Sequence, residues 1–275
     1  RTCLMNHPEL LSENLSAGYD GQPILSNVSI KIPQNKISVI LGANGCGKST
    51  LLKTFARLLK PEGGTITLDG KNISSIPSRQ IAQKLGLLPQ SPIVPEGIKV
   101  TDLVARGRFP YRRAFGGLST EDFQAVEEAL EMMGITSLAD RSVDELSGGQ
   151  RQRVWIALAL AQQTDILLLD EPTTYLDISY QVEILDLLTD LNRKRHTTIV
   201  MVLHDINLSA RYADYIFAMC KGQLAAQGTP SQIITPALMK QVYGLNCQII
   251  PDPVSGTPLI IPEGRHHLQH SRAAS

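Results

Sequence analysis

A glycine-rich stretch at 42–49, GANGCGKS, has the residue types that can bind a phosphate chain. Its spacing is Gly, four residues, Gly-Lys-Ser, and it stands between a strand pattern, ISVIL, and a helical pattern, TLLKTFARLL. Glycines let backbone N–H groups turn inward around phosphates, and the helix N-terminus adds positive potential. A chance glycine turn is the alternative, and the flanking elements argue against it. We therefore expect these residues to bind ATP: Gly42, Ala43, Asn44, Gly45, Cys46, Gly47, Lys48, Ser49 and Thr50.

Within this loop, Lys48 would reach the β- and γ-phosphates and Ser49 would bind Mg²⁺. The stretch ILLLDE at 166–171 supplies the acidic residues that such chemistry needs. Its apolar run is typical of a buried parallel strand, whose last residues reach the carboxyl edge of the sheet. We expect Asp170 to hold Mg²⁺ through water and Glu171 to polarise the attacking water. An ordinary strand can also end in Asp-Glu, so this prediction depends on the phosphate loop.

The pentapeptide LSGGQ at 146–150 predicts a second place for an anion. Ser147 can cap a helix that starts near Gln150, and Gly148-Gly149 expose backbone N–H groups there. The following segment, QRQRVWIALALAQ, has helical spacing. Taken alone, the pentapeptide is equally well explained as a capped helix behind a glycine turn.

The phosphate loop, LSGGQ and ILLLDE in this order closely resemble the ATPase subunits of ATP-binding cassette (ABC) proteins, over nearly the whole chain. The resemblance implies an enzyme that hydrolyses ATP with Mg²⁺ as its cofactor. It also implies a homodimer in the ATP-bound state, with two copies lying head to tail. Residues of one copy would then complete the ATP site of the other: Ser147, Gly148, Gly149, Gln150 and Asp177.

The resemblance assigns roles to further single residues. Tyr19 corresponds to the aromatic residue that stacks on adenine, although a hairpin tyrosine is a reasonable alternative. Gln90 corresponds to the glutamine that reaches Mg²⁺ and the attacking water, so the expected metal group is Ser49, Gln90 and Asp170. His204 corresponds to a histidine that contacts the γ-phosphate, although a lone histidine at a strand end is usually structural. Tyr175 departs from the family pattern, which more often has Ala or Gly there.

Three features resemble the ATPases of ferric-siderophore, iron-complex and vitamin B12 importers, with the siderophore group closer. They are the segment ARGRFPYRRAFGG at 105–117, the Tyr-Leu-Asp that follows EPTT, and the C-terminal YGLNCQIIPDPVSGTPLIIP. The resemblance implies integral-membrane permease subunits as partners and, indirectly, a substrate-binding protein. It places the permease interface at Arg106, Arg108, Phe109 and Tyr111. The alternative is a solvated basic loop.

Other functions stay open at this point. A non-transport ABC ATPase, such as one for Fe–S cluster assembly, is the main alternative. DNA-repair types have a long coiled coil between the two half-sites, and no heptad pattern is present here. An importer ATPase for vitamin B12 or haem is a further possibility. A binding module without turnover is disfavoured by Lys48, Glu171 and His204.

The composition narrows the class of protein. The 275 residues carry 26 basic and 26 acidic side chains, and this balance disfavours a protein that coats nucleic acid. The four cysteines are scattered without a CxxC pair, as expected of free thiols in a reducing compartment. No apolar leader or membrane-spanning run occurs. We expect a peripheral protein at the cytoplasmic face of the cell (inner) membrane, attached through permease subunits.

The order of patterns predicts an α/β fold of the ABC ATPase type. We expect a P-loop NTPase core, an N-terminal antiparallel β subdomain and an inserted helical subdomain. The single domain would cover residues 1–263, with its core at 1–90 and 166–263 and its helical signature subdomain at 91–165. Residues 264–275 would form a disordered tail.

Overall fold

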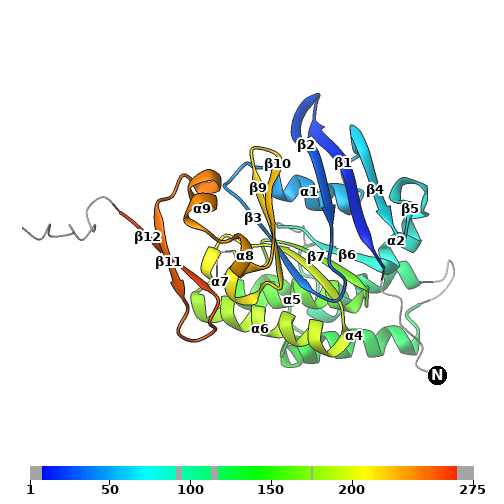
Figure 1. Cartoon of the computed structure of the whole chain (residues 1–275). Coiled ribbons are helices and arrows are strands. Elements are labelled where there is room, and N and C mark those ends of the chain that lie inside the picture. Colours follow the sequence, from blue (N-terminus) through cyan, green and yellow to red (C-terminus); the bar gives the residue numbers. More distant parts are fainter. Residues whose placement is uncertain (1–7, 91–94, 113–116, 175, 265–275) are drawn as a thin grey trace, which may run out of the picture.

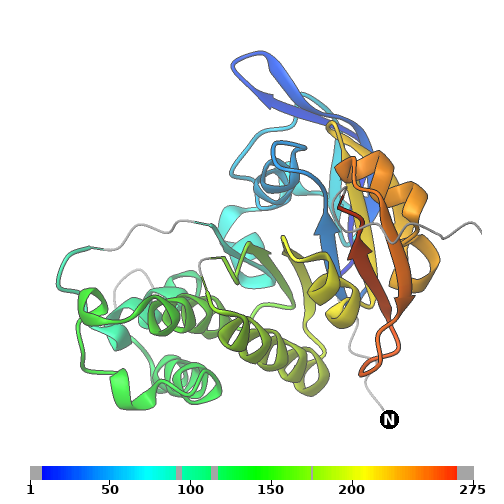
Figure 2. The same cartoon turned by 90° about the vertical axis from the view of Figure 1, so that its left-hand side faces the viewer.

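The computed structural model of the chain describes residues 8–90, 95–112, 117–174 and 176–264. These residues form a mostly parallel sheet with helices, an antiparallel sheet beside it, and a helical unit below them (Figures 1 and 2). This arrangement confirms the predicted fold class. No helix in the described ranges is long and apolar enough to cross a membrane. The predicted tail from 265 onward, the four residues 113–116 and Tyr175 lie outside the described residues.

The central sheet has six strands in the order β10-β9-β3-β8-β7-β6. All neighbouring pairs are parallel except β10 with β9, which is antiparallel. Every residue of β3, β7 and β8 is buried, which explains their unbroken apolar runs. In sheet order the strands span Gln223–Gly228, Tyr215–Cys220, Ile37–Leu41, Thr198–Val202, Ile166–Asp170 and Leu85–Leu88.

Alternate residues of these strands serve two hydrophobic clusters, one on each face of the sheet. Val39 and Leu169 pack in the cluster that includes the long helices α5 and α6, Gly148–Ala161 and Ile178–Arg195. Ile40 instead packs toward helix α1, Lys48–Phe55, and the antiparallel sheet. Helix α1, and with it the phosphate loop, is therefore held between the central sheet and the antiparallel sheet.

The antiparallel sheet has the order β2-β1-β4-β5. Its last turn, Asp69-Gly70, has positive φ at both residues, 54° and 72°, as a two-residue type I′ hairpin requires. Asp-Gly between two short strand patterns is the dipeptide that favours such a hairpin. Helix α2, Ser78–Lys84, follows the short 3₁₀ turn η1, Ile73–Ser75. The four strands span Gln22–Lys31, Leu10–Tyr19, Gly63–Leu68 and Lys71–Asn72.

The helical unit lies between β6 and β7 in the sequence. Ser119 caps α4 through a reciprocal capping box with Asp122, as expected of a serine that precedes an acidic first turn. Ser147 caps α5 in the same way with Gln150. The remaining elements of the unit are α3, Val100–Ala105; η2, Arg106–Tyr111; α4, Thr120–Met132; η3, Thr136–Leu138; and η4, Val143–Glu145.

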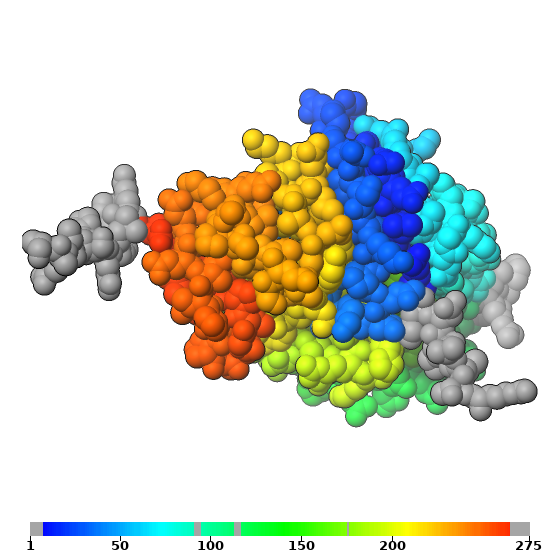
Figure 3. All heavy atoms as spheres, in the orientation of Figure 1, coloured from blue at the N-terminus to red at the C-terminus, as the bar shows by residue number. Residues whose placement is uncertain are grey.

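The C-terminal elements pack beside the central sheet, next to β9 and β10, and β11 and β12 form a separate two-stranded sheet. In Figure 3 they form one continuous surface with β9 and β10, which in turn lie beside β1 and β2. The hairpin of β11 and β12 packs on α7, where Asn207 exchanges two hydrogen bonds with the backbone of Ile260. These elements are α7, Ile206–Tyr212; α8, Pro230–Ile233; α9, Pro236–Tyr243; β11, Cys247–Pro251; and β12, Pro258–Pro262.

The predicted helix after the phosphate loop is shorter than its apolar spacing indicates. It ends at Phe55, and Leu58 is 67% exposed. Arg57 takes a left-handed conformation with φ of 59°, and its guanidinium donates to the carbonyls of Ile73 and Ile76. These contacts accompany the left-handed conformation of Arg57, and α1 therefore ends before it reaches Pro61.

Candidate active site

The phosphate loop joins the end of β3 to the start of α1, and its backbone leaves N–H groups without a cap. Gly47, the residue before α1, has a left-handed φ of 101° and no side-chain hydrogen bond at the helix start. A Cβ at Gly47 would lie 2.6 Å from Cδ2 of Leu25, so only glycine fits there without movement of its neighbour. The first amides of a helix need a partner from outside the helix, and a phosphate can supply it.

Lys48 is the only positively charged side chain that is buried within the described part of this loop, at 5% exposed. Its Nζ donates to the carbonyl oxygens of Gly42, at 2.8 Å, and Ala43, at 3.1 Å. Lys48, near the end of the loop, is therefore hydrogen-bonded to the first two residues of the loop. In this position it adds a full positive charge to the partial charges of the open amides.

The hydroxyl of Ser49 donates to Oδ1 of Asp170 over 2.9 Å, which joins the loop to the end of β7. Burial raises the pKa of Asp170, the hydrogen bond from Ser49 lowers it, and the nearby Glu171 raises it again, for a net upward shift. A cation would relieve this cost of burying the carboxylate. Among the described residues, no group of three or more His, Cys, Asp or Glu side chains could hold a metal ion by itself. Two oxygen donors beside a phosphate loop suit Mg²⁺, which is bound by few protein oxygens plus phosphates.

Glu171 is held by side chains from three segments. Gln90 donates to its Oε2 over 2.6 Å and Thr174 to the same oxygen over 3.0 Å. Nε2 of His204 lies 2.8 Å from its Oε1. The backbone of Glu171 has a φ of 56°, which is rare for a residue with a side chain and is frequent at functional sites. Glu171 is therefore fixed in direction by both its backbone and its partners.

These groups line one cleft of about 430 Å³. That volume falls within the range of about 300–1,000 Å³ that is usual for small-molecule sites. The cleft collects the phosphate loop, the residues that hold Glu171, and an apolar side chain from β2. Its lining residues are Ile24, Asn44, Gly45, Gly47, Lys48, Ser49, Thr50, Gln90, Glu171, Thr174 and His204.

The residues expected to act on a second copy lie outside this cleft. Ser147 is exposed at the start of α5, where its Oγ accepts from the amide of Gln150 over 3.3 Å. Gly149 lies against the ring of Tyr180, and an added Cβ would be 3.5 Å from that ring. Asp177 is exposed immediately before α6. Their roles stay predictions, as does that of Tyr19, which ends β1 at 41% exposed and does not line the cleft.

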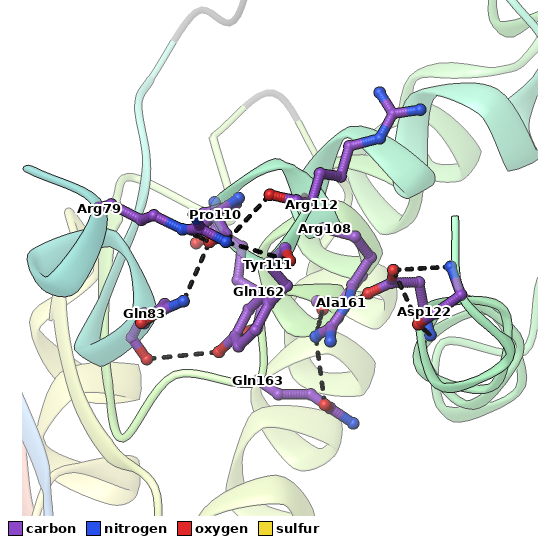
Figure 4. Close-up of polar contacts among 11 residues, drawn as sticks. Arg79, Gln83, Arg108, Pro110, Tyr111, Arg112, Asp122, Ala161, Gln162 and Gln163 are labelled. Atoms are coloured by element: carbon purple, nitrogen blue, oxygen red, sulfur yellow. Dashed lines mark hydrogen bonds and ion pairs between the residues drawn. The ribbon is translucent and has the colours of Figure 1, made fainter. Parts of the chain in front are cut away.

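The structure contradicts one part of the predicted permease interface. Arg108 is 5% exposed, forms a 2.8 Å ion pair with Asp122, and donates to the carbonyl of Ala161 (Figure 4). Burial raises the pKa of Asp122, but the hydrogen bonds from Ser119 and Arg108 outweigh it and hold this pKa below its usual value. Arg108 is thus a structural residue, and its assignment to the interface is wrong.

Tyr111 is also turned largely inward. Its hydroxyl donates to the carbonyl of Gln162 over 2.8 Å, and the Arg108 guanidinium lies 3.9 Å from the centre of its ring (Figure 4). Arg106 and Phe109 are exposed, Phe109 at 54%, so these two remain candidates for a contact.

Two residues near the site were not predicted from the sequence. Thr174 follows Glu171 by three positions, in the same strand-end loop, so its contact with Glu171 could have been inferred from that spacing. Tyr243 accepts a hydrogen bond from the amide of Gly42 over 2.9 Å. Nothing near Tyr243 in the sequence indicates this contact.

Comparisons with known proteins agree with this geometry. Residues 25–174 match the family model described as ABC transporter. The ferric enterobactin transport ATP-binding protein of Escherichia coli is 50% identical over 256 residues, which are 93% of this chain and 94% of that protein. A chain of an ABC transporter solved in an inward-facing conformation has a TM-score of 0.82 and 30% identity, over 95% of this chain and 100% of that one.

A bacterial ABC transporter cassette solved as a dimer has a TM-score of 0.71 and 29% identity, over 80% of this chain and 98% of that one. The family match covers the phosphate loop, LSGGQ and Glu171 together, and the relatives extend it to nearly the whole chain. The chain belongs to the ABC transporter family, as an ATP-binding subunit that hydrolyses ATP.

Proposed function

We propose that this chain acts as a Mg²⁺-dependent dimeric ATPase that powers import of a ferric siderophore through membrane permease subunits. The observation that carries the hydrolytic part is the geometry of Glu171, whose carboxylate is fixed by Gln90, Thr174 and His204 inside the phosphate-loop cleft. A buried, oriented carboxylate beside a phosphate site can position a water molecule and accept its proton.

Each group has one task in this proposal. The open amides of the loop and the ammonium of Lys48 bind the β- and γ-phosphates. Glu171 orients the water, whose oxygen bonds to the γ-phosphorus while its proton moves to the carboxylate and the β–γ bridging oxygen leaves with ADP. His204 and Gln90 hold Glu171 and face the γ-phosphate. Mg²⁺, bound at Ser49, Asp170 and Gln90, would neutralise phosphate charge.

The dimer follows from the division of the site. Ser147, Gly148 and Gln150 lie outside the ATP cleft of their own chain. They form the capped start of α5, so in an isolated subunit they have no nucleotide to contact. A head-to-tail dimer would bring this segment and Asp177 onto the ATP of the second copy. The bacterial ABC transporter cassette that was solved as a dimer supports the dimer itself.

The cargo is proposed from the relatives. The Escherichia coli relative is named for ferric enterobactin transport, and the similarity extends across the C-terminal segment as well as the motifs. A permease would hold the chain at the cytoplasmic face of the cell (inner) membrane and receive cargo from a substrate-binding protein. Phe109 is exposed, and the guanidinium of the half-buried Arg112 lies 5.2 Å from its ring, an aromatic–arginine pair of the kind that interfaces favour.

Reconstitution tests the proposal. The chain is used to capture its permease from detergent-solubilised membranes, and the complex is placed in vesicles with the substrate-binding protein. We expect ATP-dependent uptake of an iron-55-labelled ferric siderophore, and no uptake of vitamin B12 or haem. Uptake of one of those two would replace the cargo assignment. Capture of soluble Fe–S assembly proteins without a permease would overturn the transport function.

Phe109→Ala tests the docking surface, with Phe123→Ala as a matched control because Phe123 is 57% exposed on α4. We expect Phe109→Ala to reduce permease capture while the ATPase activity of the isolated chain stays near wild type. Equal capture by the two variants would remove Phe109 from the interface.

A further inference from the structure

Gly42, the first residue of the phosphate loop, is held through both of its backbone polar groups. The N–H of Gly42 donates to the hydroxyl of Tyr243 over 2.9 Å, and its carbonyl accepts from Lys48 Nζ over 2.8 Å. A side chain at Gly42 would collide with the surroundings, because its Cβ would lie 2.4 Å from Sγ of Cys46 and 2.6 Å from the carbonyl oxygen of Met219. The conformation of the Gly42 backbone therefore determines where Lys48 is anchored.

Tyr243 is presented by a well-defined helix end. It is the last residue of α9, which Thr235 caps at its start and Gly244 ends with a left-handed φ of 66°. Leu238, Met239 and Val242 are buried, and α9 packs on β9 beside the loop (Figure 1). The phenol therefore has little freedom to move away from Gly42. Burial raises the pKa of Tyr243 to about 12, against a smaller opposing effect of the Gly42 amide, so the hydroxyl stays neutral.

A second bond from the same half of the chain holds the middle of the loop. Gly222, in the turn between β9 and β10, donates to the carbonyl of Cys46 over 3.1 Å. Its own carbonyl accepts from the amide of Ser26 in β2. The loop is thus braced at Gly42 and at Cys46 by elements that follow residue 215 in the sequence. The family match ends at 174, so these braces lie beyond the segment that it covers.

We propose that Tyr243 is a positioning residue for ATP binding, which fixes the backbone at Gly42 so that Lys48 and the loop amides are preorganised for phosphates. The inference rests on the proposed role of Lys48 at the phosphates. Without the phenol oxygen, the buried amide of Gly42 loses its acceptor, and an unpaired buried amide is costly. The loop then spends more time in other conformations, and ATP must order it on binding. The groups around Glu171 are untouched, so the chemical step should keep its rate.

Tyr243→Phe removes this one oxygen, and Tyr212→Phe is its matched control. The hydroxyl of Tyr212 also makes a 2.8 Å hydrogen bond, to Asp186, and burial likewise raises its pKa to about 12, but it lies between α7 and α6. For Tyr243→Phe we expect about a tenfold rise in the KM for ATP and a similar loss of affinity for a fluorescent ATP analogue, as one lost buried acceptor implies. We expect kcat at saturating ATP to stay within about twofold. A change that weakens only the binding of ATP raises KM and leaves the hydrolysis step of bound ATP unchanged.

Tyr212→Phe should leave both constants near wild type. Equal KM values in the two variants would overturn the inference, and so would a fall in kcat at unchanged KM. Lys48→Ala, measured alongside, distinguishes a failure of the proposed function from a failure of the role assigned to Tyr243. If Lys48→Ala does not weaken ATP binding, the proposed function fails at this site; if only Tyr243→Phe has no effect, the inference alone fails.

A measurement on the unaltered chain guards against a variant that does not fold. The Gly42 amide should exchange its proton with solvent at least about tenfold more slowly than the amide of Gly45, whose surroundings are open. Where Tyr243→Phe does fold, exchange at Gly42 should become faster, and Tyr212→Phe should not change it. Equal exchange at the two glycines in the unaltered chain would also overturn the inference.

Discussion

The core cleft and the helical unit use charged residues in opposite ways. In the cleft, Lys48 and Glu171 line an opening of about 430 Å³, and the buried Asp170 accepts a hydrogen bond from Ser49 of its lining. The helix that starts there lacks a side-chain cap. In the helical unit, Arg108 is turned inward onto Asp122. The exposed helix start of α5 is already capped by Ser147.

This difference indicates a division of work. An uncapped helix start with a nearby ammonium can bind a phosphate by itself, because the anion supplies the missing cap. A self-capped start has fewer unsatisfied amides, so it can only add contacts to an anion that another molecule brings. The core should therefore bind and hydrolyse ATP, whereas the helical unit should act as a stable carrier of a surface for the second copy.

Glu171→Gln should give the largest effect, because it removes the charge that accepts a proton while it keeps the shape and the contacts. We expect ATP hydrolysis to fall by about 10²–10⁴-fold, as is typical when a general base is lost. ATP should still bind and should hold two copies together. Glu131→Gln, at an exposed position of α4, is the matched control. Turnover is measured by phosphate release and dimerisation by size-exclusion chromatography with ATP.

A wild-type rate in a monomeric Glu171→Gln variant would remove Glu171 from the catalytic role. The core would then lack the hydrolytic group that distinguishes it from the helical unit.

A pair of substitutions separates the two glycine-rich segments. Lys48→Ala should weaken ATP binding to an isolated subunit by about ten- to hundredfold, as loss of a charged hydrogen-bond donor implies. Ser147→Arg should leave that binding near wild type, since Ser147 lies outside its own cleft, yet it should abolish turnover by blocking dimer closure. Nucleotide titration and steady-state hydrolysis measure the two effects. Equal loss of ATP affinity in both variants would contradict a head-to-tail dimer.

The core could be predicted from local sequence because its signals are local. The glycines between Gly42 and Ser49 have the spacing that a phosphate loop requires, and the apolar run before Asp170 indicates a buried strand. In the helical unit, arginines next to aromatics resembled an exposed surface. The structure turns Arg108 inward because Gly107 allows η2 to lie against Leu158, where a Cβ would be 2.4 Å from the carbonyl oxygen.

The partners of Arg108 are 14 and 53 residues away, and Tyr243 is 201 residues from Gly42. Contacts at such separation depend on how whole elements pack, and no periodicity near either residue encodes them. Local spacing therefore predicted the phosphate loop and the strand that ends at Asp170, and the family resemblance supplied Gln90 and His204. The interior of the helical unit and the C-terminal brace required the tertiary structure.

Arg108→Met tests whether this inward charge holds the helical unit together. The change leaves Asp122 buried without its partner, and breaking a buried pair in this way typically costs about 3–5 kcal/mol of stability. Arg106→Met is the matched control, because Arg106 is exposed, two residues from Arg108, and its loss should cost less than about 0.5 kcal/mol. Urea denaturation measures both. Similar stability of the two variants would mean that Arg108 is not structural and would reopen its assignment to an interface.

The smallest expected effect compares the two capping boxes of the helical unit. Ser119 caps α4 with Asp122, and Ser147 caps α5 with Gln150, in each case through hydrogen bonds in both directions. Replacing either serine with alanine removes one cap and should cost about 1 kcal/mol of stability. Only Ser147 belongs to the segment assigned to the second copy's ATP. Ser147→Ala should therefore also reduce turnover at high protein concentration, whereas Ser119→Ala should leave turnover near wild type once both are measured well below their melting temperatures. If the two variants lose the same stability and the same activity, α5 begins with an ordinary cap, and the division of work between core and helical unit loses its support on the side of the helical unit.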